Sequence, residues 1–408
     1  MVATAAGAAA SIGERAVDIT SVQRHLHEAG IDAWLLYDFR GSNPLARRVL
    51  GLPSEGGSRR WFYLIPRHGT PAKLVHRIES GALDSLPGDK VVYLRWQELE
   101  QGLAHILRGC RRVAMEYAPR NAIPYVSRVD AGTVELVRSL GVEVVSSGDL
   151  VQQFEAVWDR EQWAMHLEAA EHTRAALEDS FAFIAEALRH KRPVRESDVQ
   201  QRILAYFRRH GLVTWHAPIV AVGPHSGDPH YEITPASDTP IVEDALVLVD
   251  LWAKLDRPRA VYSDLTWVGW TGASVPDEVA RVFAVVAAAR DRAIETVRQA
   301  FAQKRPIYGY QVDDAARGVI AAAGLDAYFV HRTGHSIGQE THGNGANMDN
   351  LETHEARQIL PGTCFSIEPG VYLPTFGIRS EVNVFVDWHG QVHVTGGEPQ
   401  RDIPALLA

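Results

Sequence analysis

The chain has 408 residues, more than one hydrophobic core usually organises, so two domains are expected. Hydrophobic residues make up 46% of it, charged residues 22%, and the formal net charge is −9. This composition is typical of a globular protein with a sizeable core. Binders of nucleic acid or of anionic membranes usually present a basic face, so the acidic balance argues against both. We therefore expect small molecules or peptides as partners, with no nucleic acid and no membrane.

The two cysteines, Cys110 and Cys364, are far apart in the sequence. They offer no disulfide framework and indicate a reducing, cytoplasmic location. The N-terminal run MVATAAGAAASIGER has no Lys or Arg before its alanine-rich stretch. We expect a disordered tail there rather than a signal peptide. No apolar run reaches the roughly 18 residues that a membrane span needs.

Helical and strand patterns alternate from Ile19 to Val151 and predict an α/β domain, bounded at residues 1–155. Helices are predicted at residues 21–30, 96–107 and 125–141, the first stopped by Gly30. Strands are predicted at AWLLYDF, RRWFYLIP, AKLVH, KVVYLRW, RRVAMEY and VEVVSS. No glycine-rich nucleotide motif follows any of these strands, so nucleotide binding has no support.

Residues 156–408 form the second predicted domain. Apolar residues at three- and four-residue spacing predict helices over residues 160–190, 276–301 and 310–324. A further helix is predicted at residues 197–211, with Ser197 as its N-cap and Gly211 as its stop. Helices and strands recur in a similar order along this half of the chain.

Two aspartates mark a first unusual context, VLVDLWAKLDRPRAVYSDLTW, in which Asp250 and Asp264 interrupt apolar strands. A hairpin with a charged turn at residues 256–258 would bring both carboxylates to one face. Burying an unpaired carboxylate costs several kcal/mol, so the pair requires a counter-cation. The alternative is that each aspartate pairs with an arginine or lies at an exposed strand end.

Glu368 in SIEPGVY and Glu381 in IRSEVNVFV form a second pair, on two strands joined by a turn. His335 follows Gly334, which permits a close backbone approach so that the imidazole can reach inward. Four carboxylates and one imidazole suit two divalent cations such as Mn²⁺, Fe²⁺, Co²⁺ or Zn²⁺. A water between two such cations loses a proton near neutral pH and becomes a nucleophile.

These contexts resemble the motifs of the pita-bread metallopeptidase family, which includes methionine aminopeptidase, aminopeptidase P and prolidase (Xaa-Pro dipeptidase). The whole chain is similar to the two-domain members. The resemblance implies an α/β creatinase-like N-terminal domain at residues 1–155 and an α+β pita-bread catalytic domain at residues 156–408. It also implies a homodimer or a higher homo-oligomer.

The resemblance implies a role for each site residue. Asp250 would be a terminal ligand of one metal, Asp264 and Glu381 would bridge both, and His335 and Glu368 would complete the other. Glu368 would also move a proton. The remaining candidates are catalytic or substrate-binding: His230 lining the pocket, His331 holding the substrate, His342 contacting the scissile carbonyl, and Arg379 supporting the ligands or binding a carboxylate.

Each of these assignments has a plainer alternative. His230 follows Pro229 in what reads as a loop and could be an exposed residue. Arg379 lies two residues before Glu381 and could be its charge partner. His216 and His225 match no motif, so we interpret them as ordinary loop and strand residues.

The chain departs from the family pattern at several positions. Leu251 and Trp252 follow the first aspartate, where glycine is common, and the spacing to Asp264 is longer than usual. Trp267 stands where an arginine is common. A polar, mobile-looking segment begins at Gly343, where an acidic residue is expected. These changes spare the ligands but put substrate choice in question.

The resemblance predicts hydrolysis of peptide bonds that precede proline, with two divalent ions as cofactors. Mn²⁺ is the favoured ion, with Co²⁺, Zn²⁺ or Fe²⁺ as alternatives. The expected substrates are small peptides with proline in the second position. We favour an Xaa-Pro dipeptidase over an Xaa-Pro aminopeptidase that acts on longer peptides. Two other classes share the fold: a metal-free creatine-type hydrolase and a catalytically inactive interaction protein. Both typically lose metal ligands, whereas this chain has all five.

Overall fold

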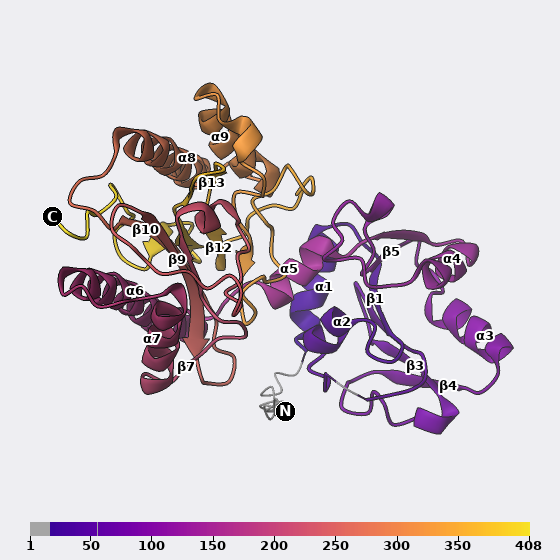
Figure 1. Cartoon of the computed structure of the whole chain (residues 1–408). Helices are drawn as coiled ribbons and strands as arrows, with labels where there is room; N and C mark the ends of the chain where they lie inside the picture. The colour runs from indigo at the N-terminus through magenta and orange to yellow at the C-terminus, as the bar shows by residue number, and fades with distance from the viewer. Residues whose placement is uncertain (1–16, 55) are drawn as a thin grey trace. The chain divides into compact units, whose positions relative to one another are not determined.

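The computed structural model describes residues 17–54 and 56–408. The chain divides into two compact units, Met1–Glu155 and Ala156–Ala408 (Figure 1). The predicted N-terminal tail lies outside the described residues. Among the residues that the structure describes, no helix is long and apolar enough to cross a membrane.

The first unit is built on a six-stranded mixed sheet in the order β4-β3-β2-β1-β5-β6. Its six strands are confirmed at β1 (Ala33–Asp38), β2 (Trp61–Pro66), β3 (Ala72–His76), β4 (Asp89–Tyr93), β5 (Arg112–Met115) and β6 (Glu143–Ser146). Its helices are α1 (Ile19–Glu28), α2 (Pro44–Val49), α3 (Trp96–Ile106), α4 (Ala131–Ser139) and α5 (Gly148–Glu155), with short 3-10 turns η1 (Arg77–Glu79) and η2 (Pro119–Asn121). Successive residues of a strand point to opposite faces. Trp34 and Leu36 therefore pack with α1, α2 and α5, whereas Leu35 and Tyr37 pack with α3 and α4.

Two helix predictions need correction. The helix predicted over residues 125–141 begins only at Ala131, because Asp130 caps it by accepting a hydrogen bond from the Thr133 amide at 2.8 Å. The helix α7 (Glu196–Arg209) begins before Ser197, so Ser197 is not its N-cap. The Ser197 hydroxyl instead donates to Asp238 at 2.9 Å.

In the second unit, β-sheet lies between two helix pairs (Figure 1). The helices are α6 (Arg160–Arg189) and α7 on one side and α8 (Asp277–Ala302) and α9 (Gly309–Ala322) on the other. One sheet has the order β10-β9-β7, with β8 also paired to β9, and a second has the order β11-β12-β15-β16. The strands are β7 (Leu212–Val213), β8 (Ile219–Val222), β9 (Leu246–Leu255), β10 (Ser263–Trp270), β11 (Ser336–Ile337), β12 (Thr363–Ile367), β13 (Gly370–Tyr372), β14 (Gly377–Arg379), β15 (Val382–Val386) and β16 (Val392–Thr395). The 3-10 turns η3 (Gly223–Gly227) and η4 (Asp326–Tyr328) complete the unit.

The central strand β9 separates two cores. Val247, Val249 and Leu251 pack in the cluster that contains the α6 and α7 side chains. Leu248 and Trp252 belong to the other cluster, which contains the α8 and α9 side chains. Because side chains alternate along a strand, Asp250 shares its face with Leu248 and Trp252. The alternation therefore directs Asp250 away from α6 and α7.

We expect acid to destabilise the fold through His166, which lies on α6. It is fully buried, with Nδ1 2.8 Å from the Tyr262 carbonyl oxygen and Nε2 2.7 Å from the Thr395 hydroxyl. Burial lowers the pKa of His166 from 6.5 to about 4. His166 therefore binds a proton more readily in the unfolded chain than in the folded one. The contribution of the neutral His166 to stability is complete above pH 6.5 and is lost as the pH falls towards 4. We expect a loss of about 3 kcal/mol in the free energy of unfolding across that window.

Urea unfolding at pH 7 and at pH 4.5 measures this loss. The matched variant His166→Gln cannot titrate, so its free energy of unfolding should fall less between the two pH values than that of the wild type. An equal fall in both proteins would contradict this role of His166.

Candidate metal centre and active site

The β9–β10 hairpin brings the two aspartates together on one face. Asp264 is paired with Trp252, and Asp250 is paired with Thr266. The carboxylates are therefore diagonal neighbours, close enough for long side chains to interact. The predicted hairpin is confirmed, although β9 continues past Asp250 to Leu255.

The second acid pair lies at a break between two ladders. The β12–β15 ladder ends with the pair Ile367 and Val382, and the β13–β14 ladder resumes with Gly370 and Arg379. Proline has no amide proton, so Pro369 interrupts the ladder, and the two predicted strands become four. Glu368 and Glu381 are the next pair beyond Ile367 and Val382 in this register.

His335 is positioned by a close contact between two backbones. The Ser366 amide donates to the His335 carbonyl at 2.8 Å, and the His335 amide donates to the Ser366 hydroxyl at 2.9 Å. A Cβ atom on Gly334 would lie only 2.0 Å from the Ser366 carbonyl oxygen. Only glycine therefore fits before His335, and the predicted close approach is confirmed.

The acids and the imidazole converge in one buried cluster. His335 Nε2 lies 3.6 Å from Asp264 Oδ2 and 3.4 Å from Glu368 Oε1. One potential ligand atom each from Asp264, His335 and Glu381 lie within 4.8 Å of one another. Asp250 forms an ion pair with Arg379 at the edge of the cluster. The donor set is rich in oxygen and suits hard or borderline divalent cations.

Within the described part of the chain, several carboxylate oxygens of the cluster are unpaired hydrogen-bond acceptors. Asp250 Oδ1, Asp264 Oδ1 and Glu381 Oε1 are buried and have no hydrogen-bond partner among the residues that the structure describes. Burial and the neighbouring carboxylates raise the pKa of Glu381 well above its usual value, and burial raises the pKa of Asp250 to about 7. Buried polar atoms are normally satisfied. These residues therefore fit cations, which would supply both the missing contacts and the missing positive charge.

Arg379 extends the cluster through a chain of hydrogen bonds. Its guanidinium donates to Thr266 Oγ1 at 3.1 Å, to the Tyr372 hydroxyl at 2.9 Å and to Asp250. Tyr372 also lies 2.7 Å from His331 Nε2, and the Thr266 hydroxyl donates to Glu381 Oε2 at 2.7 Å. Arg379 therefore holds Asp250 directly and Glu381 through Thr266. Most of its hydrogen-bond donors are already used within the protein.

A cavity of about 580 Å³ opens onto the cluster. It is lined by all nine predicted site residues: Asp250, Asp264, His335, Glu368, Glu381, His230, His331, His342 and Arg379. The His342 ring lies 4.3 Å from that of His335. The charge of His335, together with burial, lowers the pKa of His342 to about 3, so that imidazole is neutral.

Three aromatic residues of the cavity wall had no assigned role in the sequence. Trp215 and His216 lie beside Trp252, with ring centroids 6.1 and 6.3 Å from it. His216 lies in a loop, as interpreted from the sequence, but its place in the cavity wall was not predicted. His216 lies in the segment that connects β7 to β8, and the pairing of both strands with β9 places this segment beside the cavity. A warning signal was the position of Trp252, which shares the face of Asp250.

Two expected departures do not disturb the centre. Trp267 lies on the opposite face of β10 from Asp264, where the Arg174 guanidinium stacks 3.8 Å from its ring centroid. The segment after His342 is tied down, since the Gly343 amide donates to the Ser336 carbonyl at 2.6 Å and the Gly345 amide to the Ser336 hydroxyl at 2.9 Å. Its mobile appearance in the sequence came from small residues that permit this close packing.

The α/β unit, the pita-bread unit and the buried cluster together define a metallo-exopeptidase. The chain belongs to metallopeptidase family M24, whose sequence model matches residues 164–387. Membership implies divalent metal ions.

Known relatives match this chain over different lengths. The probable dipeptidase PepE of Mycobacterium tuberculosis is 30% identical over 353 residues, 85% of this chain and 86% of the relative. The Xaa-Pro dipeptidase of Pyrococcus furiosus is 30% identical over 182 residues, 44% of this chain and 47% of that protein. The crystal structure of dipeptidase PepE from Mycobacterium ulcerans matches with a TM-score of 0.69 at 24% identity, covering 95% and 96% of the two chains. That structural likeness shows the shared two-domain fold.

Proposed function

We propose that this protein is an Xaa-Pro dipeptidase that uses two divalent cations, with Mn²⁺ as the favoured ion. The observation that carries the proposal is a set of buried carboxylate oxygens beside the His335 imidazole. These oxygens, on Asp250, Asp264 and Glu381, have no partner within residues 17–54 and 56–408. The cations would be held by Asp250, Asp264, His335, Glu368 and Glu381. Four carboxylates would balance two divalent charges.

Divalent cations at this site would supply Lewis-acid activation of water and of the scissile carbonyl. Glu368 accepts the proton of the attacking water and passes it to the leaving nitrogen. The Ser366 hydroxyl, 3.1 Å from Glu368 Oε1, orients this carboxylate. His342, which is neutral and lines the cavity, donates a hydrogen bond to the carbonyl oxygen as negative charge develops on it. His331 holds the Tyr372 hydroxyl, and His230 faces the substrate.

The cavity wall supports a small substrate with an apolar group. Trp215, His216 and Trp252 form an aromatic surface beside Asp264. Pockets of a few hundred Å³ bury small ligands. A pyrrolidine ring can lie against these aromatic faces. The relative named as a probable dipeptidase supports dipeptides as substrates, and the relative named as an Xaa-Pro dipeptidase supports proline in the second position.

A parallel assay on an Ala-Pro dipeptide and an Ala-Pro-Ala tripeptide with added Mn²⁺ tests the proposal. We expect kcat/KM to be at least about tenfold higher for the dipeptide. Calorimetric titration should show two Mn²⁺ ions bound per chain. Faster cleavage of the tripeptide would identify an Xaa-Pro aminopeptidase instead. Cleavage of neither peptide by protein with both ions bound would contradict proline-directed hydrolysis.

Two further expectations stay predictions. The resemblance predicts a homodimer or higher homo-oligomer, which light scattering tests. The cysteine content predicts a cytoplasmic location, where both thiols stay reduced.

A further inference from the structure

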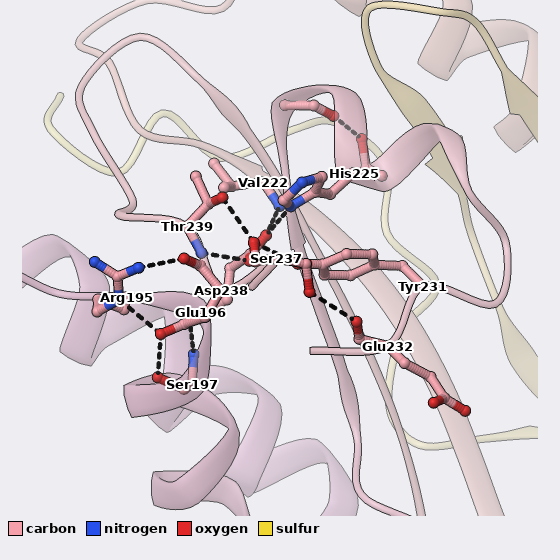
Figure 2. Close-up of polar contacts among 12 residues, drawn as sticks. Arg195, Glu196, Ser197, Val222, His225, Tyr231, Glu232, Ser237, Asp238 and Thr239 are labelled. Atoms are coloured by element: carbon pink, nitrogen blue, oxygen red, sulfur yellow. Dashed lines mark hydrogen bonds and ion pairs between the residues drawn. The ribbon is translucent and has the colours of Figure 1, made fainter. Parts of the chain in front are cut away.

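Glu196 is the first residue of α7, and its carboxylate is fully buried outside the metal cluster. Figure 2 shows it at the centre of a polar network. Glu196 Oε1 accepts from the Val222 amide at 2.8 Å and lies 2.9 Å from His225 Nδ1. Glu196 Oε2 accepts from the Tyr231 hydroxyl at 2.8 Å and the Thr239 amide at 3.0 Å. Both oxygens are therefore saturated with partners.

All four partners belong to one segment, residues 222–239. The middle of this segment forms a wall of the cavity through Asp228, Pro229, His230, Tyr231 and Glu232. His225 stacks on Tyr231 with ring centroids 4.3 Å apart, which joins two of the four contacts to each other. One buried carboxylate thus fixes the start, the turn and the end of the segment that presents His230.

The far side of the same segment is held by the hairpin that leads to Glu381. The Gly377 amide donates to the Ser226 hydroxyl at 2.8 Å, and Arg379 donates to the Pro229 carbonyl at 3.3 Å. A Cβ atom on Gly227 would lie 2.7 Å from the Leu373 carbonyl oxygen. The segment is therefore fitted between α7 and the hairpin, and Glu196 sets its position from the α7 side.

We propose that Glu196 is a positioning residue for substrate: it sets the place of His230 and Tyr231 relative to the metal ligands. This inference rests on the proposed peptidase function. The charge of Glu196 is suited to the task, because an anion at the first turn of a helix is stabilised by the helix dipole. Glu196 contacts none of the five predicted ligands, so its effect reaches the reaction only through the segment.

The substitution Glu196→Gln removes the positioning without changing the volume. A glutamine side chain has one acceptor oxygen and one NH₂ group. The Tyr231 hydroxyl and the His225 ring can each adapt by accepting instead of donating. The Val222 and Thr239 amides cannot, so in either orientation of the glutamine one of these backbone N–H groups loses its acceptor.

We expect Glu196→Gln to lower kcat/KM on Ala-Pro by about ten- to a hundredfold, mainly through KM, because a misplaced wall weakens substrate positioning. The number of Mn²⁺ ions bound should stay at the wild-type value. Amide hydrogen exchange in residues 222–239 should become faster, while exchange in β12 and β15 should not change. The exchange measurement needs no turnover, so it tests the positioning even if the proposed substrate is wrong.

Glu116→Gln is the matched control. Glu116 is a buried carboxylate of the first unit that accepts from Trp34 at 2.6 Å, Asn43 at 2.7 Å and Ser147 at 3.0 Å. Its substitution should lower the melting temperature but leave kcat and KM at wild-type values. Wild-type kinetics and exchange in Glu196→Gln would overturn the proposal. An equal loss of kcat/KM in both variants would also overturn it, because general destabilisation would then explain the effect.

Discussion

Replacing Glu368 with glutamine is expected to lower kcat on Ala-Pro by about 10³-fold. Glutamine keeps the shape and the hydrogen bond from the Ser366 hydroxyl but cannot accept and release a proton. Steady-state kinetics at saturating Mn²⁺ measure the loss, with metal content determined on the same samples.

Glu178→Gln is the control for this experiment. Glu178 lies on α6, largely exposed and paired with Arg174 at 2.6 Å, and its loss should leave kcat unchanged. A Glu368→Gln variant that binds both ions and keeps near-normal kcat would remove Glu368 from proton transfer.

The substitution Gly334→Ala is expected to lower the free energy of unfolding by about 3 kcal/mol or more and to abolish activity. The new Cβ would meet the Ser366 carbonyl oxygen at 2.0 Å and its carbon at 2.8 Å. Both are backbone atoms, so relief requires β11 to move away from β12. His335 would move with β11, and the cluster would lose its imidazole. Urea unfolding and the dipeptide assay measure the two effects.

Gly318→Ala provides the comparison for Gly334→Ala. Gly318 lies within α9, and a Cβ atom there would meet nothing within 4 Å. Alanine favours helix over glycine, so we expect an increase of up to about 1 kcal/mol in the free energy of unfolding, with unchanged activity. Similar destabilisation at both positions would show that the close contact at Gly334 is not the cause.

The acid and histidine cluster could be predicted because each member stands out locally. Asp250 and Asp264 interrupt apolar strands, and Gly334 before His335 signals a tight approach. Strand alternation and hairpin pairing are local rules that assign such residues to one face. The family resemblance then supplied the correspondence between the two halves of the cluster, which spacing alone did not provide.

Features that depend on distant partners could not be predicted in this way. Ser197 looked like an N-cap, but its hydroxyl binds Asp238, 41 residues away. Trp267 looked like a change at the metal centre, but its stacking with Arg174 on α6 shows that it belongs to the other face. Glu196 drew no attention, because an acid in the first turn of a helix is common. Its partners become apparent only when residues 222–239 fold over it.

The two ladders around Glu368 and Glu381 share one register. The alignment of these acids and the position of residues 222–239 can therefore be altered separately. Paired strands on both sides of the break fix the acids, so the turn at residues 373–376 does not determine their alignment. The Leu373 carbonyl of that turn nevertheless lies close to Gly227, within residues 222–239, where an added Cβ atom would be 2.7 Å from the carbonyl oxygen. A change in the length of this turn can therefore shift the segment at residues 222–239 while Glu368 and Glu381 keep their alignment.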